Sequence, residues 1–293
     1  MHITTQETLD SIPSDVEAIS IVWEQIFDPL TWFLNLKTFN FENLSNKTNL
    51  KKIEIRYVDL WDKDFKNINK IPNLKTLIIN KCFVRYVTEL TKNTSIEELD
   101  LSYNKEIPMW DLDKFEKMKQ LKVLKLRDIH ISDPEIQYFF WNENLEVLDL
   151  SSNYITNTWL KHIVKFKNLK ELDLSHTHIK WKESIDTFKE LEKLEYLTVS
   201  WNWLKDEDII WLVDLPNLKY LNLFGNELTD KAVNTITKLK NLKELNISFN
   251  RFTIKGIEEI INTLDLERIY VSCEKKYEEI KNSKKTKVLI VWN

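Results

Sequence analysis

Apolar residues recur along most of this chain at fixed positions within a unit of 24 or 25 residues. In each unit a leucine is followed by apolar residues three, five and ten positions later, and the residues between them are mainly polar. The period-two alternation in the middle of the unit predicts a short β-strand with one apolar face. One unit cannot bury that face alone, so the period predicts a stack of units with a continuous core. The clearest units begin at Leu121, Leu145, Leu169, Leu194, Leu218, Leu242 and Leu266.

The unit can be written Leu-x-x-Leu-x-Leu-x-x-Asn-x-φ, where φ is apolar. Copies read LEVLDLSSNYI from Leu145, LEYLTVSWNWL from Leu194, LKYLNLFGNEL from Leu218 and LKELNISFNRF from Leu242. These residues resemble the leucine-rich-repeat family, and the 24-residue period is similar to its intracellular type. The resemblance implies an α/β fold, a leucine-rich-repeat solenoid shaped as a horseshoe, with a concave parallel β-sheet and a helical or irregular convex side. It also implies a role in protein recognition, although the motif specifies the fold far better than the function.

The asparagine of the unit falls where each strand ends and the chain turns away from the sheet. A buried side-chain amide can both donate to and accept from backbone groups that have lost their strand partners. We therefore expect a structural ladder of buried amides rather than a ligand site. Cys82 and Thr177 replace the asparagine in two copies. The ladder consists of Asn104, Asn153, Asn202, Asn226 and Asn250.

The period divides the chain into three parts. Residues 1–33 form an N-terminal cap, with a degenerate first strand at 16–21. Residues 34–273 form the repeat array of about 10–11 repeats, including an imperfect copy at Leu36, Phe39 and Phe41. Residues 274–293 form a C-terminal cap, a polar helix followed by an apolar strand at 288–292. From Leu121 onward, helix-start signals and three- or four-residue apolar spacing predict helices between the strands. No linker-like tract interrupts the period, so we expect a single structural domain.

Composition excludes several classes of function. The formal net charge of −4, with both signs interspersed, does not favour nucleic-acid binding. No apolar stretch approaches the roughly 20 residues that span a bilayer, and the first residues lack the pattern of a secretory signal peptide. Cys82 and Cys273 lie too far apart in a solenoid to form a disulfide, which fits a reducing compartment. We therefore expect a cytoplasmic monomer without membrane or nucleic-acid partners, and export as an effector without a signal stays open.

The polar residues that flank the inward leucines predict the composition of the open sheet face. Asp149 and Asp173 are expected side by side, and their like charges would raise a pKa or hold a cation. This pattern is also common in the family, so we favour a structural role. His176 and His178 lack a third and fourth ligand for zinc. No phosphate-binding, metalloprotease or paired-cysteine motif occurs, and the serines have no forced His/Asp partners, so we expect neither an enzyme nor a cofactor. The polar row expected to orient a partner is Arg56, Asp100, Lys125, Arg127, Asp149 and Asp173.

The aromatic residues give the clearest functional signal. Six tryptophans fall in connecting segments, where packing between helices is expected, namely Trp61, Trp110, Trp141, Trp159, Trp181 and Trp211. A second set is expected to face outward from the strands near the C-terminal end, with Gly225 leaving a notch between aromatic walls. Exposed aromatic residues dominate binding hot spots, although stacking across strands would also explain them. The set comprises Tyr196, Trp201, Trp203, Tyr220, Phe224, Phe249 and Tyr270.

Three functions remain open. The leading hypothesis is a non-enzymatic protein–protein interaction module that binds a protein partner on its concave face. The alternative is an effector or enzyme inhibitor that acts on a host or rival target. The least favoured is a hidden hydrolase or metal-binding protein, for which Asp149, Asp173 and His176 are the residues to test.

Overall fold

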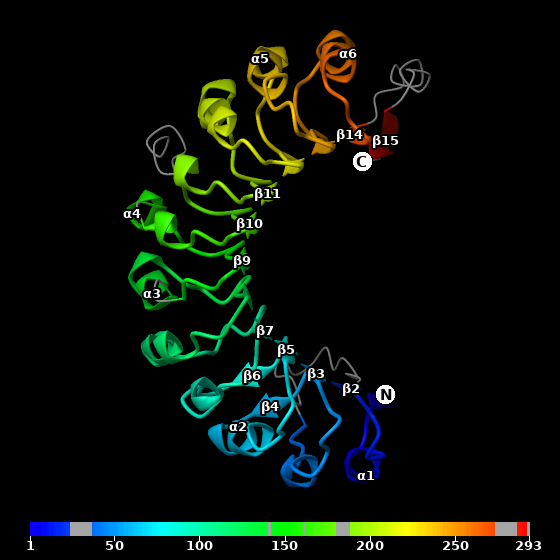
Figure 1. Ribbon diagram of the computed structural model, residues 1–293, viewed down its shortest axis with the longest axis vertical. Coiled ribbons are helices and arrows are strands. Elements are labelled where there is room, and N and C mark those ends of the chain that lie inside the picture. The colour runs from blue at the N-terminus through cyan, green and yellow to red at the C-terminus, as the bar shows by residue number, and fades with distance from the viewer. Residues whose placement is uncertain (24–36, 140–141, 161, 180–187, 273–285, 292–293) are drawn as a thin grey trace, which may run out of the picture. The chain divides into compact units, whose positions relative to one another are not determined.

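The chain forms two compact units, Met1–Leu145 and Glu146–Asn293. The computed structural model describes residues 1–23, 37–139, 142–160, 162–179, 188–272 and 286–291. In each unit, parallel strands lie side by side in chain order, and the connecting segments return on the other side of the strands (Figure 1). The prediction of a single domain stays a prediction, and the units are described in turn.

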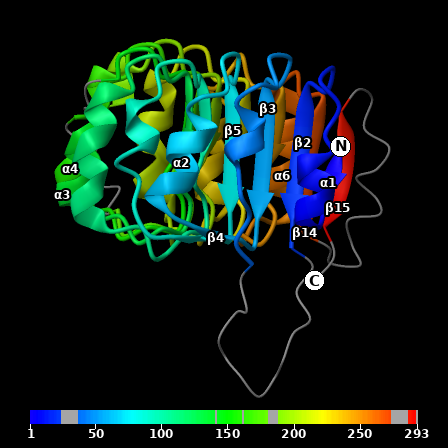
Figure 2. The same cartoon turned by 90° about the horizontal axis from the view of Figure 1, so that it is seen from below.

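The main sheet of unit 1 has the strand order β1-β2-β3-β5-β7-β8, and neighbouring strands are parallel. Figure 2 shows β2, β3 and β5 side by side. A small second sheet pairs β4 with β6 just beyond the ends of β3 and β5. The strands are β1 His2–Ile3, β2 Ala18–Val22, β3 Lys52–Arg56, β4 Asp59–Leu60, β5 Thr76–Asn80, β6 Phe83–Val84, β7 Glu98–Asp100 and β8 Val123–Lys125.

The helices of unit 1 are short. The α-helices are α1 Gln6–Asp10, α2 Asp62–Ile68 and α3 Asp133–Ile136, and the 3-10 helices are η1 Glu42–Leu44, η2 Leu90–Lys92, η3 Met109–Lys117 and η4 Gln137–Phe139. Local caps explain where some of them begin. In α1, Thr5 accepts from the backbone N–H of Thr8, and at α3 the Ser132 N–H donates to Glu135 in a capping box.

Unit 2 has the strand order β9-β10-β11-β12-β13-β14-β15, again parallel throughout. Its strands are β9 Val147–Asp149, β10 Glu171–Asp173, β11 Tyr196–Thr198, β12 Tyr220–Asn222, β13 Glu244–Asn246, β14 Arg268–Ser272 and β15 Lys287–Val291. Its helices are α4 Asn157–Leu160, η5 Ile163–Lys165, η7 Phe188–Glu190, η8 Asp206–Asp214, η9 Asp230–Ala232, α5 Val233–Ile236 and α6 Ile254–Thr263.

The core lies between the strands and their return segments. In β11, Leu197 is fully buried, whereas Tyr196 is exposed and Thr198 is half-buried. The next apolar residue, Val199, is also buried. The same alternation recurs in strands of both units, so the period-two prediction is confirmed. Each apolar residue removed from water contributes roughly 1.5–3 kcal/mol before the cost of ordering the chain is subtracted.

The two strand predictions for the N-terminal part have different outcomes. The degenerate first strand is confirmed as β2, but the copy expected at Leu36, Phe39 and Phe41 is wrong as a strand of the main sheet. There β2 pairs directly with β3, and Lys37 forms only an isolated bridge with Val58. Phe39 and Phe41 are buried because they belong to the return segment that fills the core behind these strands. Leu36 lies outside the described residues.

The return segments are tighter than predicted. The helices expected from Leu121 onward are mostly 3-10 turns or single α-turns, and α6, with 10 residues, is the longest α-helix described. A 3-10 helix rises about 2.0 Å per residue, compared with 1.5 Å in an α-helix, so it spans the same distance with fewer residues. The C-terminal apolar strand is confirmed as β15, whereas the predicted polar helix before it falls outside the described residues.

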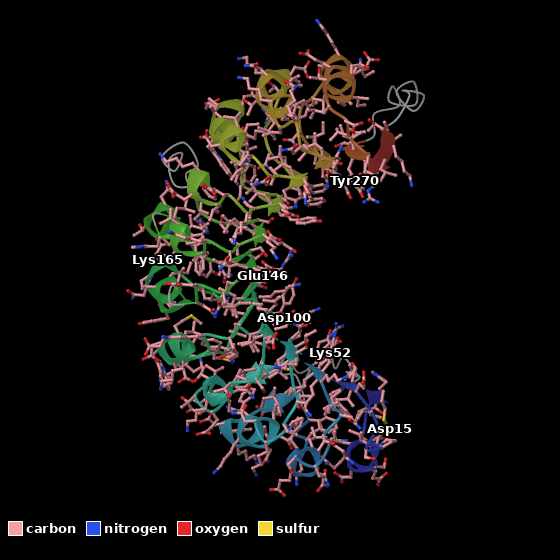
Figure 3. The ribbon with its side chains drawn as sticks, in the orientation of Figure 1. Asp15, Lys52, Asp100, Glu146, Lys165 and Tyr270 are labelled. Atoms are coloured by element: carbon pink, nitrogen blue, oxygen red, sulfur yellow. The ribbon has the colours of Figure 1, made fainter. Side chains whose placement is uncertain are left out.

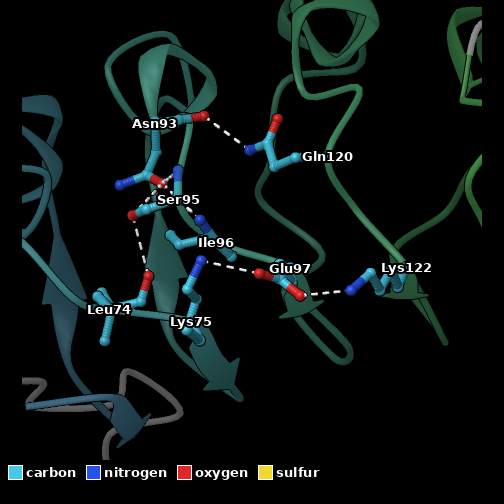
Figure 4. A network of polar contacts seen from close by, with 8 residues as sticks. All are labelled: Leu74, Lys75, Asn93, Ser95, Ile96, Glu97, Gln120 and Lys122. Carbon is cyan, nitrogen blue, oxygen red and sulfur yellow. Dashed lines mark hydrogen bonds and ion pairs between the residues drawn. The ribbon is translucent and has the colours of Figure 1, made fainter.

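Ion pairs follow the edge where the strands begin. In unit 1 the Glu97 carboxylate contacts the Nζ atoms of Lys75 at 2.8 Å and Lys122 at 2.7 Å (Figure 4). These two ammonium groups, Lys122 first, lower the pKa of Glu97 from 4.5 to about 2. Nearby, Asn93 Oδ1 accepts from the backbone N–H groups of Ser95 and Ile96, which fixes the turn into β7. Charge therefore reinforces the strand register at this edge.

Candidate functional site

The strand registers place the predicted open-face residues in rows. In unit 1, Asp100 lies opposite Lys125, and in unit 2, Asp149 lies opposite Asp173. The row continues in unit 2 from Asp173 through Thr198, Asn222 and Asn246 to Tyr270. Figure 3 shows Asp100 and Tyr270 on the strand side of their own units, and Lys165 on the helix side of unit 2.

The acidic and amide residues of this row have a local structural task. A side-chain oxygen of each accepts the backbone N–H two residues later, in Asp100–Ser102, Asp149–Ser151, Asp173–Ser175, Asn222–Phe224 and Asn246–Ser248. This turn satisfies a donor just where the strand ends. The Asp-x-Ser spacing was a sequence signal for it, although Asp100 also lies opposite Lys125 in the strand register. Within the described ranges, no ion pair joins those two side chains.

The serines two residues further along alternate with the open-face row in the sequence, which would place them on the same open face. The structure places them inside instead, because the chain has already begun to turn at that point. Ser151 and Ser248 are fully buried, and Ser175 Oγ donates to Ser200 Oγ at 3.2 Å. Such hydroxyls are not accessible to a substrate.

The ladder asparagines are buried or half-buried and contact the backbone of their own or neighbouring repeats. Asn226 is 7% exposed; its Oδ1 accepts from the N–H groups of Asn202 and Leu204, and its Nδ2 donates to the carbonyls of Val199 and Leu223. Asn104 accepts from Cys82 N–H, Asn202 from Thr177 N–H and Asn250 from Leu228 N–H, and Asn153 donates to Leu150 O. Burial raises the pKa of the Cys82 thiol to about 12. Cys273 lies outside the described residues.

A ridge of left-handed residues follows the ends of the strands. Residues one position before the ladder have φ between 51° and 67°, namely Tyr57, Lys81, Tyr103, Asp128, Ser152, His176, Trp201, Gly225 and Phe249. Since eight of these nine are not glycine, the backbone conformation alone does not require Gly225. A Cβ at Gly225 would instead lie 2.7 Å from Cδ2 of the Trp201 indole. The predicted open notch is therefore wrong, because the Trp201 ring fills it.

Three aromatic residues of unit 2 form one continuous cluster at this ridge, which we call the aromatic cluster: Trp201 and Phe249 on the ridge, and Phe224 just before Gly225. The Trp201 and Phe224 ring centroids are 5.3 Å apart in an edge-to-face contact, and those of Phe224 and Phe249 are 4.7 Å apart. Trp201 remains 50% exposed, and Trp203 on the same turn is 74% exposed. The rings contact one another, but these contacts do not remove the Trp201 ring from solvent.

The other predicted aromatic residues lie at the beginning or middle of strands. Tyr196 is 45% exposed, and its ring lies 6.1 Å from that of Tyr220. Tyr220 and Tyr270 are half-buried. Burial, followed by the nearby Tyr270, Glu244 and Asp173, raises the pKa of Tyr220. Between these tyrosines and the aromatic cluster lie the uncharged Thr198, Asn222 and Asn246.

The polar row predicted to orient a partner is divided between the units. Arg56, Asp100, Lys125 and Arg127 belong to unit 1, and Asp149 and Asp173 belong to unit 2. Arg56 is exposed and pairs with Glu54 at 2.5 Å, whereas the Arg127 guanidinium lies 5.7 Å from the Tyr103 ring.

The tryptophans of the connecting segments differ in burial. Trp159 and Trp211 are buried as predicted, and the Trp211 ring stacks on Phe188 at 4.2 Å. The prediction is wrong for Trp61 and Trp110, which are exposed on unit 1; Trp110 is 63% exposed and has the Lys114 ammonium 5.4 Å from its ring. Trp141 and Trp181 lie outside the described residues.

Neither a metal centre nor a membrane span emerges from the part of the chain that the structure describes. There, no group of three or more His, Cys, Asp or Glu side chains is placed to hold a metal ion. His176 is exposed, and the His178 ring lies 6.0 Å from that of Tyr154. Over the same ranges, no helix combines the length and apolar character needed to cross a bilayer.

The sequence matches family models described as leucine-rich repeats. One matches residues 119–179, 143–204 and 192–252, a second matches 92–107 and a third matches 241–264. Together they cover more than half of the 293 residues. The chain therefore belongs to the leucine-rich-repeat family, as its motif indicated.

A comparison with curated proteins found no match for the sequence. Among solved structures, the chain is similar to internalin C2 (inlC2) of Listeria monocytogenes, with 25% identity, a TM-score of 0.54, and coverage of 73% of this chain and 84% of that one. It is also similar to an internalin (inlF) of the same species, at 19% identity, a TM-score of 0.59, and 98% and 84% coverage. A leucine-rich-repeat protein of Leptospira interrogans shares 22% identity, with a TM-score of 0.58 and 99% and 83% coverage. These similarities confirm the leucine-rich-repeat solenoid.

Proposed function

We propose that this protein is a non-enzymatic protein-binding module whose partner contacts the strand face of unit 2 through the aromatic cluster. Family membership favours a role in protein interaction. The observation that carries the proposal is the contiguity of Trp201, Phe224 and Phe249 together with the 50% exposure of Trp201. Aromatic anchors of this kind dominate the binding energy of protein interfaces.

The competing explanation is that the aromatic rings only stack on one another within the sheet. The exposed fraction of the Trp201 side chain argues against stacking as their only role. A tryptophan side chain buries roughly 150–250 Å² when fully covered. The half of Trp201 that stays in water therefore corresponds to about 100 Å², or about 2.5 kcal/mol at 25 cal/mol per Å². The ring contacts within the sheet do not bury this surface, so a partner that covered it would gain the corresponding binding free energy.

Further parts of the proposal follow from the sequence and the site. On unit 1, Arg56, Asp100, Lys125 and Arg127 offer mixed charges of the kind found at polar interface rims, and their orienting role stays a prediction. The burial of Ser151 and Ser248 and the local role of Asp149 argue against a hydrolytic function. We propose a cytoplasmic monomer that needs no cofactor, in keeping with the sequence prediction.

Paired capture experiments test the proposal. Trp201→Ala/Phe249→Ala removes two anchors, and Trp110→Ala, which removes an exposed tryptophan from unit 1, is the matched control. Proteins captured from lysate are quantified by mass spectrometry against the wild-type chain. We expect at least one protein to be retained by wild type and Trp110→Ala and lost with the double variant, whose thermal midpoint stays close to wild type. A capture profile that the double variant leaves unchanged would rule out this face.

A further inference from the structure

We propose that the outer edge of β15, the edge that faces away from β14, is a self-association surface. There β15 of a second copy of this chain pairs antiparallel about a two-fold axis through Leu289. This surface is separate from the aromatic cluster, so the inference goes beyond the proposed function. The monomer proposed above is then the dilute state of the protein.

The strand β15 lies outside β14 at the end of the strand order of unit 2 (Figure 1). Its five residues pair in parallel with five residues of β14, and within the described ranges β15 pairs with no other strand. An edge strand presents backbone N–H and C=O groups that can template pairing with another chain. At the other end of the strand order, β1 has only two residues, which leaves little to pair. The longer of these two edges is therefore that of β15.

The composition of β15 does not protect its edge. Natural proteins commonly guard edge strands with charged side chains or proline. Lys287 is the only charged residue of β15 and stands at its beginning. The rest of the strand has neither charge nor proline, and all four of its residues are half-buried: Val288, Leu289, Ile290 and Val291.

The apolar layer behind the sheet is still partly exposed at β15. The register places Val288 beside Ile269 of β14, and Ile290 beside Val271. Ile269 and Val271 are 0% and 1% exposed, whereas Val288 and Ile290 are only half-buried. These four residues lie on the core side of their strands, so a further strand at the outer edge would cover apolar surface that β15 leaves in water.

The backbone groups of two residues point to the outer edge. The Lys287 N–H donates to Glu267 O at 3.0 Å, so the backbone of Lys287 bonds toward β14. The N–H and C=O groups of successive residues in a strand point alternately to one side and the other. Those of Leu289 therefore also point to β14, and those of Val288 and Ile290 point outward. The outer edge thus carries two donors and two acceptors.

These four groups are arranged symmetrically about Leu289, which is why a second copy fits. When Leu289 lies opposite its own copy in an antiparallel pair, Val288 lies opposite Ile290 of the second copy. Each such pair exchanges two hydrogen bonds, so all four outer groups of each strand are used. The central cross-strand pairs are apolar, and Lys287 lies opposite Val291 rather than another lysine.

The contact is small, which sets the concentration at which it forms. Two five-residue strands bury much less than the roughly 1,200–2,000 Å² of a stable interface. We expect a monomer below roughly 5 µM and a dimer fraction that rises up to about 500 µM.

Sedimentation velocity over this concentration range measures the association. Val288→Pro removes an outer N–H, and proline is tolerated on an edge strand where its nitrogen points away from the sheet. Val288→Ala is the matched control, because it shortens the same side chain and keeps the N–H. Val288→Pro should associate about ten-fold or more weakly than Val288→Ala, since each dimer loses two hydrogen bonds. The circular dichroism of the two dilute variants should agree.

Cross-linking reads the register and does not depend on the proline variant. Leu289→Cys is made in a chain whose two native cysteines are replaced by alanine. Across the two-fold axis, the Cα atoms of the paired residues 289 are expected about 4.5 Å apart, within the range of a disulfide. Lys287→Cys is the control, because its copy lies four residues along the strand, about 14 Å away. Oxidation with diamide at about 300 µM protein should join only Leu289→Cys into a covalent dimer.

Four results would overturn the inference. The first is a wild-type chain that stays monomeric at about 500 µM, and the second is equal association of Val288→Pro and Val288→Ala. The third is equal cross-linking at positions 287 and 289. The fourth is a monomeric chain whose Val288→Pro variant loses a lysate protein that Val288→Ala captures, which would assign the edge to a strand of another protein. Association that is lost in Trp201→Ala/Phe249→Ala would move the contact to the aromatic cluster and overturn it too.

Discussion

The amide of Asn226 offers the sharpest test of what holds neighbouring repeats together. Its Oδ1 accepts from Asn202 N–H at 3.0 Å and Leu204 N–H at 3.1 Å, and its Nδ2 donates to Leu223 O at 2.9 Å and Val199 O at 3.1 Å. Asn226→Ala removes these contacts in a buried site, together with a longer one from Nδ2 to Phe224 O at 3.5 Å. Asn222→Ala, in the same repeat, is the matched control, because Asn222 is half-buried and its Oδ1 accepts from Phe224 N–H.

The expected cost can be worked from these partners. Leu223 O keeps a second donor, Asn250 Nδ2 at 2.8 Å, so its loss is small. The N–H groups of Asn202 and Leu204 lose an acceptor in a buried site, and each costs about 1–2 kcal/mol. Asn226→Ala should therefore lower the free energy of unfolding by about 2–4 kcal/mol. Asn222→Ala, which frees an N–H near solvent, should cost about 0.5–1 kcal/mol.

Urea unfolding followed by circular dichroism and by tryptophan fluorescence measures both variants. Coincident transitions by the two probes are required, since repeat arrays can unfold in parts. Hydrogen exchange at the amide of Leu204 gives an independent reading, and its protection should fall in Asn226→Ala. A difference between the two variants below about 0.5 kcal/mol would refute the claim that the amide supports its neighbours through these backbone groups.

Two further predictions concern charge and close packing. The pKa of Glu97 is depressed, so its ion pairs stabilise the fold fully above pH 4.5 and lose that effect as pH falls toward about 2. The stability difference between wild type and Glu97→Gln in urea should therefore shrink as pH falls from about 6 to about 3, and a constant difference would contradict this. Gly225→Ala places a Cβ against the Trp201 indole at a φ of 67°, and should cost about 1–2 kcal/mol and shift tryptophan emission. Ser152→Ala, at the same ridge position with a φ of 57°, should do neither.

Much of the candidate site was visible in the sequence because its register is periodic. The motif fixes which residues of each strand face away from the core, and the structure has Tyr196, Trp201 and Trp203 exposed. It could not show that Trp110 is exposed while Trp211 is buried, because both occupy return segments whose packing differs from one repeat to the next. The Asp-x-Ser turns were legible in principle from the spacing of Asp149 and Ser151.

The sequence by itself determined the repeat, the parallel strand order and the inward leucines, because these follow from spacing within one 24-residue unit. Side-chain contacts between neighbouring repeats were decided only by the tertiary structure. The Trp201 indole lies over Gly225, 24 positions later, and Lys81 lies between Tyr57 and Tyr103 from the repeats on either side. Such contacts depend on how each side chain fills the space left by its neighbour. Periodicity places these residues near one another, and packing decides which of them a partner can reach.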